Sequence, residues 1–220
     1  MSQFTRVVDA TQADFQRLLL EHPLSLALRA GNVRLGHYFA YLRETYHLVR
    51  HTPAIFKIAA ARIGDERPVL RDWYLELAEE ETGHDALCVK DLSRLGGKPE
   101  KVFAGRAGPG GWAVVTQDYY LASHGNPIGL LGTTSLSEQL GAEVAEPAVQ
   151  ALLAALKVPA AALGFIRSHG IFDAKHLADV ERAIDTLAQP DEIDEIIHAR
   201  RMAIRYCAQM LTDILETPES

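Results

Sequence analysis

Histidine and carboxylate side chains recur at helical spacing in two segments of the sequence. His169, Asp173 and His176 stand at positions i, i+4 and i+7, and Glu81 stands three residues before His84. Residues three or four positions apart lie on one face of a helix, so the side chains of each set would project in one direction. Neutral imidazole and carboxylate oxygen are ligands for iron, manganese and other divalent metals. The spacing predicts metal ligation, with a hydrogen-bonded network in the core as the alternative.

Two further carboxylates fall on the apolar faces of expected helices. Glu138 shares a face with Leu131, and Glu44 shares one with Leu48. A buried carboxylate without a partner costs several kcal/mol, so it is normally protonated, paired or bound to a metal. Four helices would then present carboxylates and histidines to one interior. Di-iron carboxylate bundles use this pattern, with a Glu from each of two helices and a carboxylate-x-x-His from each of the other two.

The neighbours of these residues have simpler interpretations. Glu79 and Glu80 are expected to belong to a solvated acidic face. Glu44 and His47 are alternative ligands from the same helix, and Arg43 beside them favours a surface charge patch as a competing interpretation. Carboxylate-rich ligation without thiolate fits iron or manganese better than zinc, whose structural sites favour cysteine.

Apolar residues spaced by three and four dominate the whole chain, and no sustained alternation typical of strands is present. We therefore predict an all-α bundle of seven to nine helices in one domain over residues 1–220, with a glycine-rich loop over 96–111. The expected helices cover about 11–30, 33–51, 52–64, 68–95, 112–124, 128–145, 147–159, 160–187 and 191–216. A capping box of Thr11 and Asp14 would open the first of them.

Composition excludes several classes of partner. The chain carries 29 Asp and Glu against 22 Lys and Arg, so a nucleic acid would be repelled on average. No apolar run approaches the ~18 residues of a membrane-spanning helix, and MSQFTRVVDATQADF lacks the order of a secretory signal. We expect a cytoplasmic protein without a membrane span. Cys88 and Cys207 fit reduced thiols better than a disulfide framework.

Four segments resemble the haem-oxygenase-like superfamily, and within it the haem-oxygenase-like di-iron oxidases and oxygenases, with more distant similarity to the PqqC and TenA families. The segments are YHLVRHTP at 46–53, EEETGHDALCVKDLSRLGGKPE at 79–100, NPIGLLGTTSLSEQLG at 126–141 and HGIFDAKHLADV at 169–180. The resemblance implies a haem-oxygenase-like fold that binds two irons instead of haem and uses dioxygen as co-substrate. It assigns metal ligation to Glu81, His84, Glu138, His169, Asp173 and His176, with Glu44 or His47 in addition.

The expected activity is oxidation of a small organic molecule by two ferrous ions and dioxygen, with manganese as the alternative metal. Apolar side chains near the predicted ligands indicate a lipophilic or aromatic part of the substrate. These side chains are Trp73, Leu77, Leu131, Phe165 and Phe172.

Three other functions compete with this one. A haem oxygenase would use His22 as its proximal ligand. A cofactorless oxidase or a thiaminase-like hydrolase would have Cys88 as its candidate nucleophile. A non-catalytic metal- or partner-binding protein would use the amphipathic helix over 191–216, which is also the expected dimer face of a homodimer.

Overall fold

Apolar stripes at helical spacing produce a helical protein. The structure, a computed structural model, describes residues 1–218, with the side chains at 103 and 171–174 left out, so the side chain of the predicted ligand Asp173 lies outside the described residues. The helices are α1 (Gln3–Leu20), α2 (Pro23–Arg29), α3 (Leu35–Val49), α4 (Thr52–Ile63), α5 (Pro68–Glu80), α6 (Asp85–Arg94), α7 (Pro99–Ala104), α8 (Pro109–Ser123), α9 (Leu130–Leu156), α10 (Gly164–Leu187) and α11 (Ile193–Glu216). The all-α prediction is confirmed, and residues 1–218 contain no strand.

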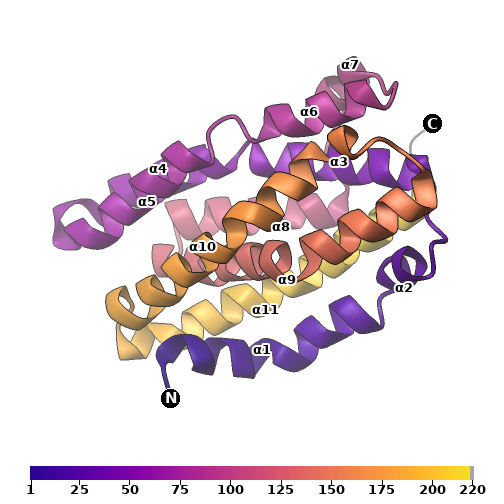
Figure 1. The fold of residues 1–220 in the computed structure, drawn as a ribbon. Helices are drawn as coiled ribbons and strands as arrows, with labels where there is room; N and C mark the ends of the chain where they lie inside the picture. The colour runs from indigo at the N-terminus through magenta and orange to yellow at the C-terminus, as the bar shows by residue number, and fades with distance from the viewer. Residues whose placement is uncertain (219–220) are drawn as a thin grey trace.

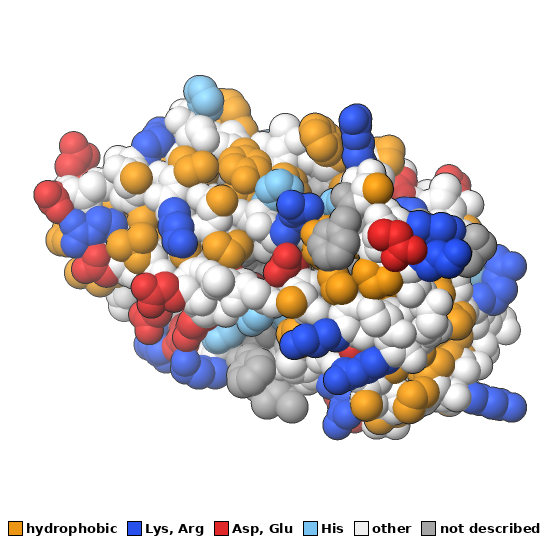
Figure 2. Space-filling model, turned by 90° about the horizontal axis from the view of Figure 1, so that it is seen from above, with side chains coloured by type: hydrophobic (Ala, Val, Ile, Leu, Met, Phe, Trp, Pro, Cys, Tyr) orange, Lys and Arg blue, Asp and Glu red, His pale blue; other side chains and the backbone are white. Residues whose placement is uncertain are grey.

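The long helices α9, α10 and α11 form the centre of the bundle (Figure 1). α9 packs against both α10 and α11, while α11 also packs against α8 and α1. The hairpin of α4 and α5 and the pair of α3 and α6 cover another side. On the face that carries α4 to α6, acidic, basic and apolar side chains are interspersed (Figure 2). None of the described helices is both long and apolar enough to span a bilayer.

Two glycines bring the central helices into close contact. A Cβ atom on Gly132 of α9 would lie 2.3 Å from the carbonyl oxygen of Ile196 on α11, and one on Gly110 of α8 would lie 2.1 Å from the amide nitrogen of Met210. Both distances are far below van der Waals contact, so any other residue would push the helices apart. The absence of a side chain at these positions therefore sets the spacing of α8 and α9 from α11.

The helix expected over 68–95 is divided into α5 and α6. α5 ends at Glu80, Gly83 adopts the left-handed conformation with φ of 91°, and α6 begins at Asp85. The hydroxyl of Thr82 donates to the carbonyl of Ala78, which satisfies one of the last acceptors of α5. Glycine adopts positive φ without steric cost, so the sequence Thr-Gly ends the helix here. Glu81 therefore stands in a turn between two helices and not on one continuous helix.

The amino-terminal helix begins earlier than expected. Ser2 caps α1, because its hydroxyl accepts a hydrogen bond from the amide of Thr5. Thr11, predicted to be the N-cap, lies buried within α1. Its hydroxyl donates to the carbonyl of Val7 and accepts from Nε of Arg200 at 3.0 Å. Thr11 thus serves a buried cation, which explains a polar residue on the apolar face.

Two helix boundaries around prolines were also predicted wrongly. Pro147 lies inside α9, which continues to Leu156. Burial of Ala145, Val149 and Leu152 on one side of α9 outweighs the hydrogen bond that the proline removes. The loop expected over 96–111 contains α7 and the start of α8. α7, the separate helix α2 and the division of 68–95 each add a helix, and the continuation of α9 past Pro147 removes one, so the described chain has more α-helices than the expected seven to nine.

Candidate metal centre

Five of the predicted ligands come together from separate parts of the fold. Glu81 and His84 come from the turn between α5 and α6, Glu138 from α9, and His169 and His176 from α10. They form two groups, Glu81 with His84 and His169, and Glu81 with Glu138 and His176. Within each group, one ligand atom per residue lies within 4.8 Å of the others. Glu81 belongs to both groups, as a carboxylate between two metal positions would.

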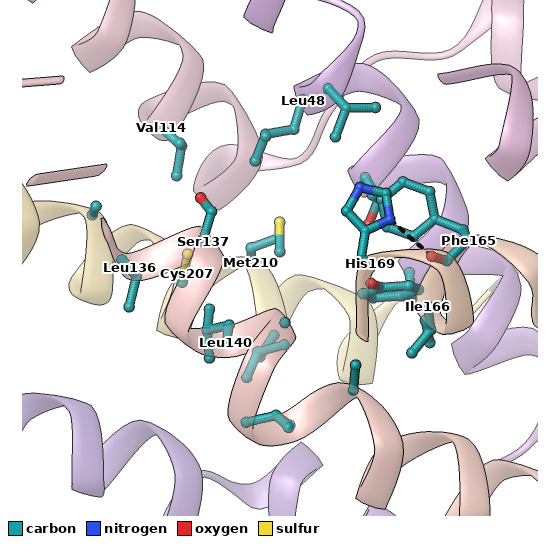
Figure 3. A pocket seen from close by; sticks show the side chains of 18 of the residues that line it. Leu48, Val114, Leu136, Ser137, Leu140, Phe165, Ile166, His169, Cys207 and Met210 are labelled. Carbon is teal, nitrogen blue, oxygen red and sulfur yellow. Dashed lines mark hydrogen bonds between the residues drawn. The ribbon is translucent and has the colours of Figure 1, made fainter. Parts of the chain in front are cut away.

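The first group is held by contacts around its two imidazole rings. Nδ1 of His84 lies 3.0 Å from Oε2 of Glu81, and the rings of His84 and His169 meet edge to face at 5.0 Å between centroids. Nδ1 of His169 donates to the carbonyl oxygen of Phe165 at 2.8 Å (Figure 3). A carbonyl only accepts, so this bond fixes the tautomer and leaves Nε2 of His169 with its lone pair. The ring is thus oriented as a metal-binding histidine usually is.

The second group includes a contact that the sequence did not predict. Nδ1 of His176 lies 3.4 Å from Oε2 of Glu138, and Nε2 of His176 lies 3.5 Å from Oε2 of Glu80. Glu80 is exposed, as expected for a solvated acidic face, but its carboxylate also contacts this cluster. The contact forms because the last residue of α5 lies beside α10. Glu80 stands four residues before His84, and this helical spacing was the indication in the sequence that Glu80 could lie near the cluster.

The pKa values in the cluster show where protons reside without metal. Burial acts to raise the pKa of Glu81, but the hydrogen bond from His84 and the nearby histidines lower it overall. Burial raises the pKa of Glu138, and the bond to Glu138 raises the pKa of His176 to about 9. The pKa of His84 is raised by Glu81, whereas burial lowers that of His169. The carboxylates therefore favour the protonated rings of His84 and His176, and a bound metal would compete with these protons.

The structure does not bring Glu44 to this cluster. Glu44 is completely buried, and its two carboxylate oxygens accept hydrogen bonds from Arg43 and from the amide of Gly108. His47, the alternative ligand from the same helix, donates through Nε2 to the carbonyl of Val102 at 2.9 Å. Both residues of α3 therefore fasten the segment around α7, and neither belongs to the two groups found among the described residues.

A cavity of about 380 Å³ reaches the candidate metal centre. Glu81, Glu138 and His169 line it, and most of its other walls are apolar. Figure 3 shows His169 at one side of this cavity and Val114 at the other. Two of the apolar residues predicted to surround a substrate, Leu77 and Phe165, line the cavity, whereas Trp73 and Leu131 do not. Phe172 lies outside the described side chains.

Asp118 is a cavity residue that sequence reasoning missed. It lies on α8 one turn after Val114, and both line the cavity. The hydroxyl of Thr133 donates to Oδ1 of Asp118 at 2.9 Å, and burial raises the pKa of Asp118 to about 7. Its spacing from Val114 and Leu121 places it on the apolar stripe of α8, which was the signal in the sequence.

Neither His22 nor Cys88, the residues named for the haem and the cofactorless alternatives, lines the cavity. Nδ1 of His22 accepts from the amide of Leu24, and Nε2 lies 3.1 Å from the hydroxyl of Thr212. Cys88 is buried and is not among the described residues that line the cavity, and burial raises the pKa of its thiol. Cys207 does line the cavity, but burial raises its pKa to about 12. Neither thiol is activated as a nucleophile, since the thiolate is the reactive form.

Comparison with known proteins agrees with the geometry. The sequence model of a family described as "Iron-containing redox enzyme" matches residues 39–207, which include every predicted ligand. None of the curated protein sequences matches the chain significantly.

Several solved structures share the fold. A domain of unknown function with a heme oxygenase-like fold from Shewanella denitrificans OS217 superposes with a TM-score of 0.89 at 20% identity, covering 97% of this chain and 92% of that one. A TenA homologue from P. horikoshii OT3 gives 0.80 at 14% identity over 99% and 100%. A putative TenA-like thiaminase from Sulfolobus solfataricus P2 gives 0.72 at 13% identity over 100% and 98%. The haem-oxygenase-like fold predicted from the sequence is thereby confirmed.

Proposed function

The chain belongs to the family of iron-containing redox enzymes, and from this premise we propose that it is a non-haem oxidase or oxygenase. It would use two iron ions and dioxygen to oxidise a small organic molecule with a lipophilic part. One observation carries the proposal: Glu81 belongs to two groups of potential ligands at once, next to an apolar cavity. A carboxylate can bridge two cations and cancel part of their charge, which a single metal site does not require.

The donor set fits iron. His84 and His169 with Glu81 would hold one ion, and Glu138 and His176 with Glu81 would hold the other. Imidazole and carboxylate without thiolate suit iron, with manganese as the alternative. The first group is richer in imidazole and the second is richer in carboxylate. Asp173, whose spacing from His169 and His176 predicts a place in the same set, remains a proposed ligand.

Iron in this site would supply the one-electron chemistry and the activation of dioxygen. The protein supplies the positioning of these ligands and the surroundings of the substrate. The Phe165 carbonyl keeps the ring of His169 in one tautomer and orientation, and Glu80 lies 3.5 Å from Nε2 of His176. The apolar walls of the cavity exclude bulk water from the substrate, which strengthens electrostatic interactions at the site and limits side reactions.

Metal reconstitution tests the proposal. The purified chain is stripped with a chelator, reconstituted with Fe(II) without oxygen, and desalted, and its iron content is measured before oxygen consumption is followed. We expect about two iron ions per chain and iron-dependent uptake of oxygen. His169→Ala and His176→Ala should each lose iron, whereas His124→Ala, at an exposed position, should bind as much as wild type. Fewer than one iron ion in a fully helical wild-type protein would refute the proposal.

A further inference from the structure

The cavity has a polar residue on the side away from the candidate metal centre. In Figure 3, Val114 and His169 lie at opposite sides, with Ser137, Cys207 and Met210 between them. Asp118 lies one helical turn from Val114 on α8, and both line the cavity. A ligand that fills the cavity would therefore have one end at Asp118 and the other near His169.

Asp118 is surrounded by protein but borders open space. It remains partly accessible because it faces the cavity. Its hydrogen bonds come from neutral groups, the hydroxyl of Thr133 at 2.9 Å and the side chain of Gln117. Neutral donors stabilise a carboxylate without cancelling its charge. A buried carboxylate of this kind is normally paired with a cation or protonated.

The described residues that line the cavity include no Lys or Arg, while Glu81, Glu138 and Asp118 supply three carboxyl groups. Two histidines, His37 and His169, also line it. Nδ1 of His37 accepts a hydrogen bond from the amide of Arg34, so that ring is neutral, and burial lowers its pKa. A ligand with a positive head group would meet, at Asp118, a carboxyl group that has hydrogen bonds but no ion pair among the described residues, and a ligand with a negative head group would be repelled there.

We propose that the cavity binds a lipophilic amine, with its ammonium group on Asp118 and its hydrocarbon part along the apolar walls toward His169. This inference names the substrate class of the proposed oxidase, and it rests on that function only in calling the amine a substrate. A cavity of about 380 Å³ lies within the range of roughly 300–1,000 Å³ that small-molecule sites occupy. An ion pair with Asp118 would orient the amine in the cavity, and contact with the apolar walls would bury most of its hydrocarbon part.

Binding of three probes of equal chain length tests the inference. Octylamine, octanol and octanoate differ in head-group charge, and their dissociation constants are measured by calorimetry on the full chain, with and without Fe(II). We expect octylamine to bind at least about tenfold more tightly than octanol, and octanoate to bind most weakly of the three without iron. Asp118→Asn should weaken octylamine by about tenfold or more and leave octanol unchanged. Ser137→Ala, a change at another polar lining residue, should leave the preference for octylamine intact.

Several results would overturn the inference. Octylamine binding no tighter than octanol would do so, and so would equal weakening of both probes by Asp118→Asn, or tightest binding of octanoate with and without iron. The comparison of probes on the wild-type chain does not depend on how well a variant folds. Failure of the proposed oxidase is separate, because a chain that binds no iron but prefers octylamine refutes only the proposed function. A chain that binds iron but shows no amine preference refutes only the inference.

Discussion

Oε2 of Glu138 on α9 lies 3.4 Å from Nδ1 of His176 on α10. The contact joins two central helices through a pair of side chains that are both about nine-tenths buried. It raises the pKa of His176 to about 9, since the carboxylate favours the protonated ring. The same pair belongs to one of the two ligand groups that share Glu81. In the metal-free chain the pair therefore acts as a structural ion pair.

This pair predicts how the stability of the metal-free chain depends on pH. The folded pKa of His176, about 9, lies above the value of ~6.5 in an unfolded chain. The stabilisation that the Glu138–His176 contact gives the folded chain is complete below pH ~6.5. It is lost as pH rises to about 9, because in that range the folded state binds more protons than the unfolded state. We expect a loss of about 1 kcal/mol in the free energy of unfolding after allowance for solvent screening. Urea denaturation of the chelator-treated chain at several pH values measures it.

The matched variants for that measurement change one carboxylate each. Glu138→Gln should remove most of the decline between pH ~6.5 and 9, because the charge opposite His176 is gone. Glu181→Gln changes an exposed residue of the same helix as His176, α10, and should preserve the decline. An unchanged slope in Glu138→Gln would show that the contact does not control the protonation of His176.

The shared position of Glu81 predicts unequal effects on metal content. Glu81→Gln removes a carboxylate from both ligand groups, whereas Glu138→Gln removes one from a single group. If the two groups bind separate ions, Glu81→Gln should lose nearly all iron, and Glu138→Gln should retain about one ion per chain. Metal analysis after anaerobic loading distinguishes the two. Equal losses in both variants would argue against a shared carboxylate.

The sequence predicted the helical architecture because apolar spacing records which side of a helix is buried. It predicted α3, α4 and α11 within a few residues, since a glycine or proline lies close to their ends. It failed at Gly83, because a single glycine is tolerated inside many helices and its left-handed conformation depends on the surrounding packing. It failed at Pro147 for the converse reason, since burial of α9 maintained a helix that local propensity would end.

The candidate site was predicted more completely than the helix ends. Glu81, His84, Glu138, His169 and His176 come together as expected. An ionisable residue on an apolar stripe must find a partner in the interior, because burial without one is costly. Several such residues on different helices therefore tend to meet, and their positions along the chain are visible in the sequence.

The surroundings of Glu44, Glu80 and Asp118 were not predicted. They depend on how the helices are oriented relative to one another, and the apolar periodicity of a single helix gives no information about that. Glu44 satisfies the requirement for a buried partner with Arg43 and Gly108. Glu80 reaches His176 only because α5 ends beside α10. Asp118 borders the cavity only because α8 packs close to α11 at Gly110.

Asp118 predicts a second dependence of stability on pH. Here burial destabilises the charged form of the side chain, whereas at His176 the carboxylate of Glu138 stabilises the charged form. The folded pKa of Asp118, about 7, exceeds the ~3.9 of an unfolded chain. For an acid with a raised pKa, the folded state binds more protons between these values, so stability falls as pH rises from about 4 to 7. We expect Asp118→Asn to be more stable than wild type by about 2 kcal/mol at pH 8 and nearly equal to it at pH 4. Denaturation of both proteins across this range is the measurement, and a constant difference at all pH values would contradict it.

Gly132 predicts the cost of separating the two central helices. A Cβ at this position would lie 2.3 Å from the carbonyl oxygen of Ile196 and 2.8 Å from the amide nitrogen of Arg200, both backbone atoms that do not move independently of α11. We expect Gly132→Ala to lower the free energy of unfolding by about 3 kcal/mol, even though alanine favours helices. Because α9 also carries Glu138, the iron content of Gly132→Ala should be lower than that of wild type as well.

Gly125→Ala is the matched control. A Cβ there would lie 3.0 Å from the exposed side chain of Tyr120, which can rotate away, and 3.3 Å from Cα of Leu121, a much smaller overlap than at Gly132. This control variant should change stability by less than about 1 kcal/mol and leave iron content unchanged. Thermal unfolding followed by circular dichroism, with metal analysis of each protein, gives both values. If Gly132→Ala were as stable as wild type, α9 and α11 would have to tolerate a wider separation than the geometry allows, and the position of Glu138 relative to His176 would not depend on that close contact.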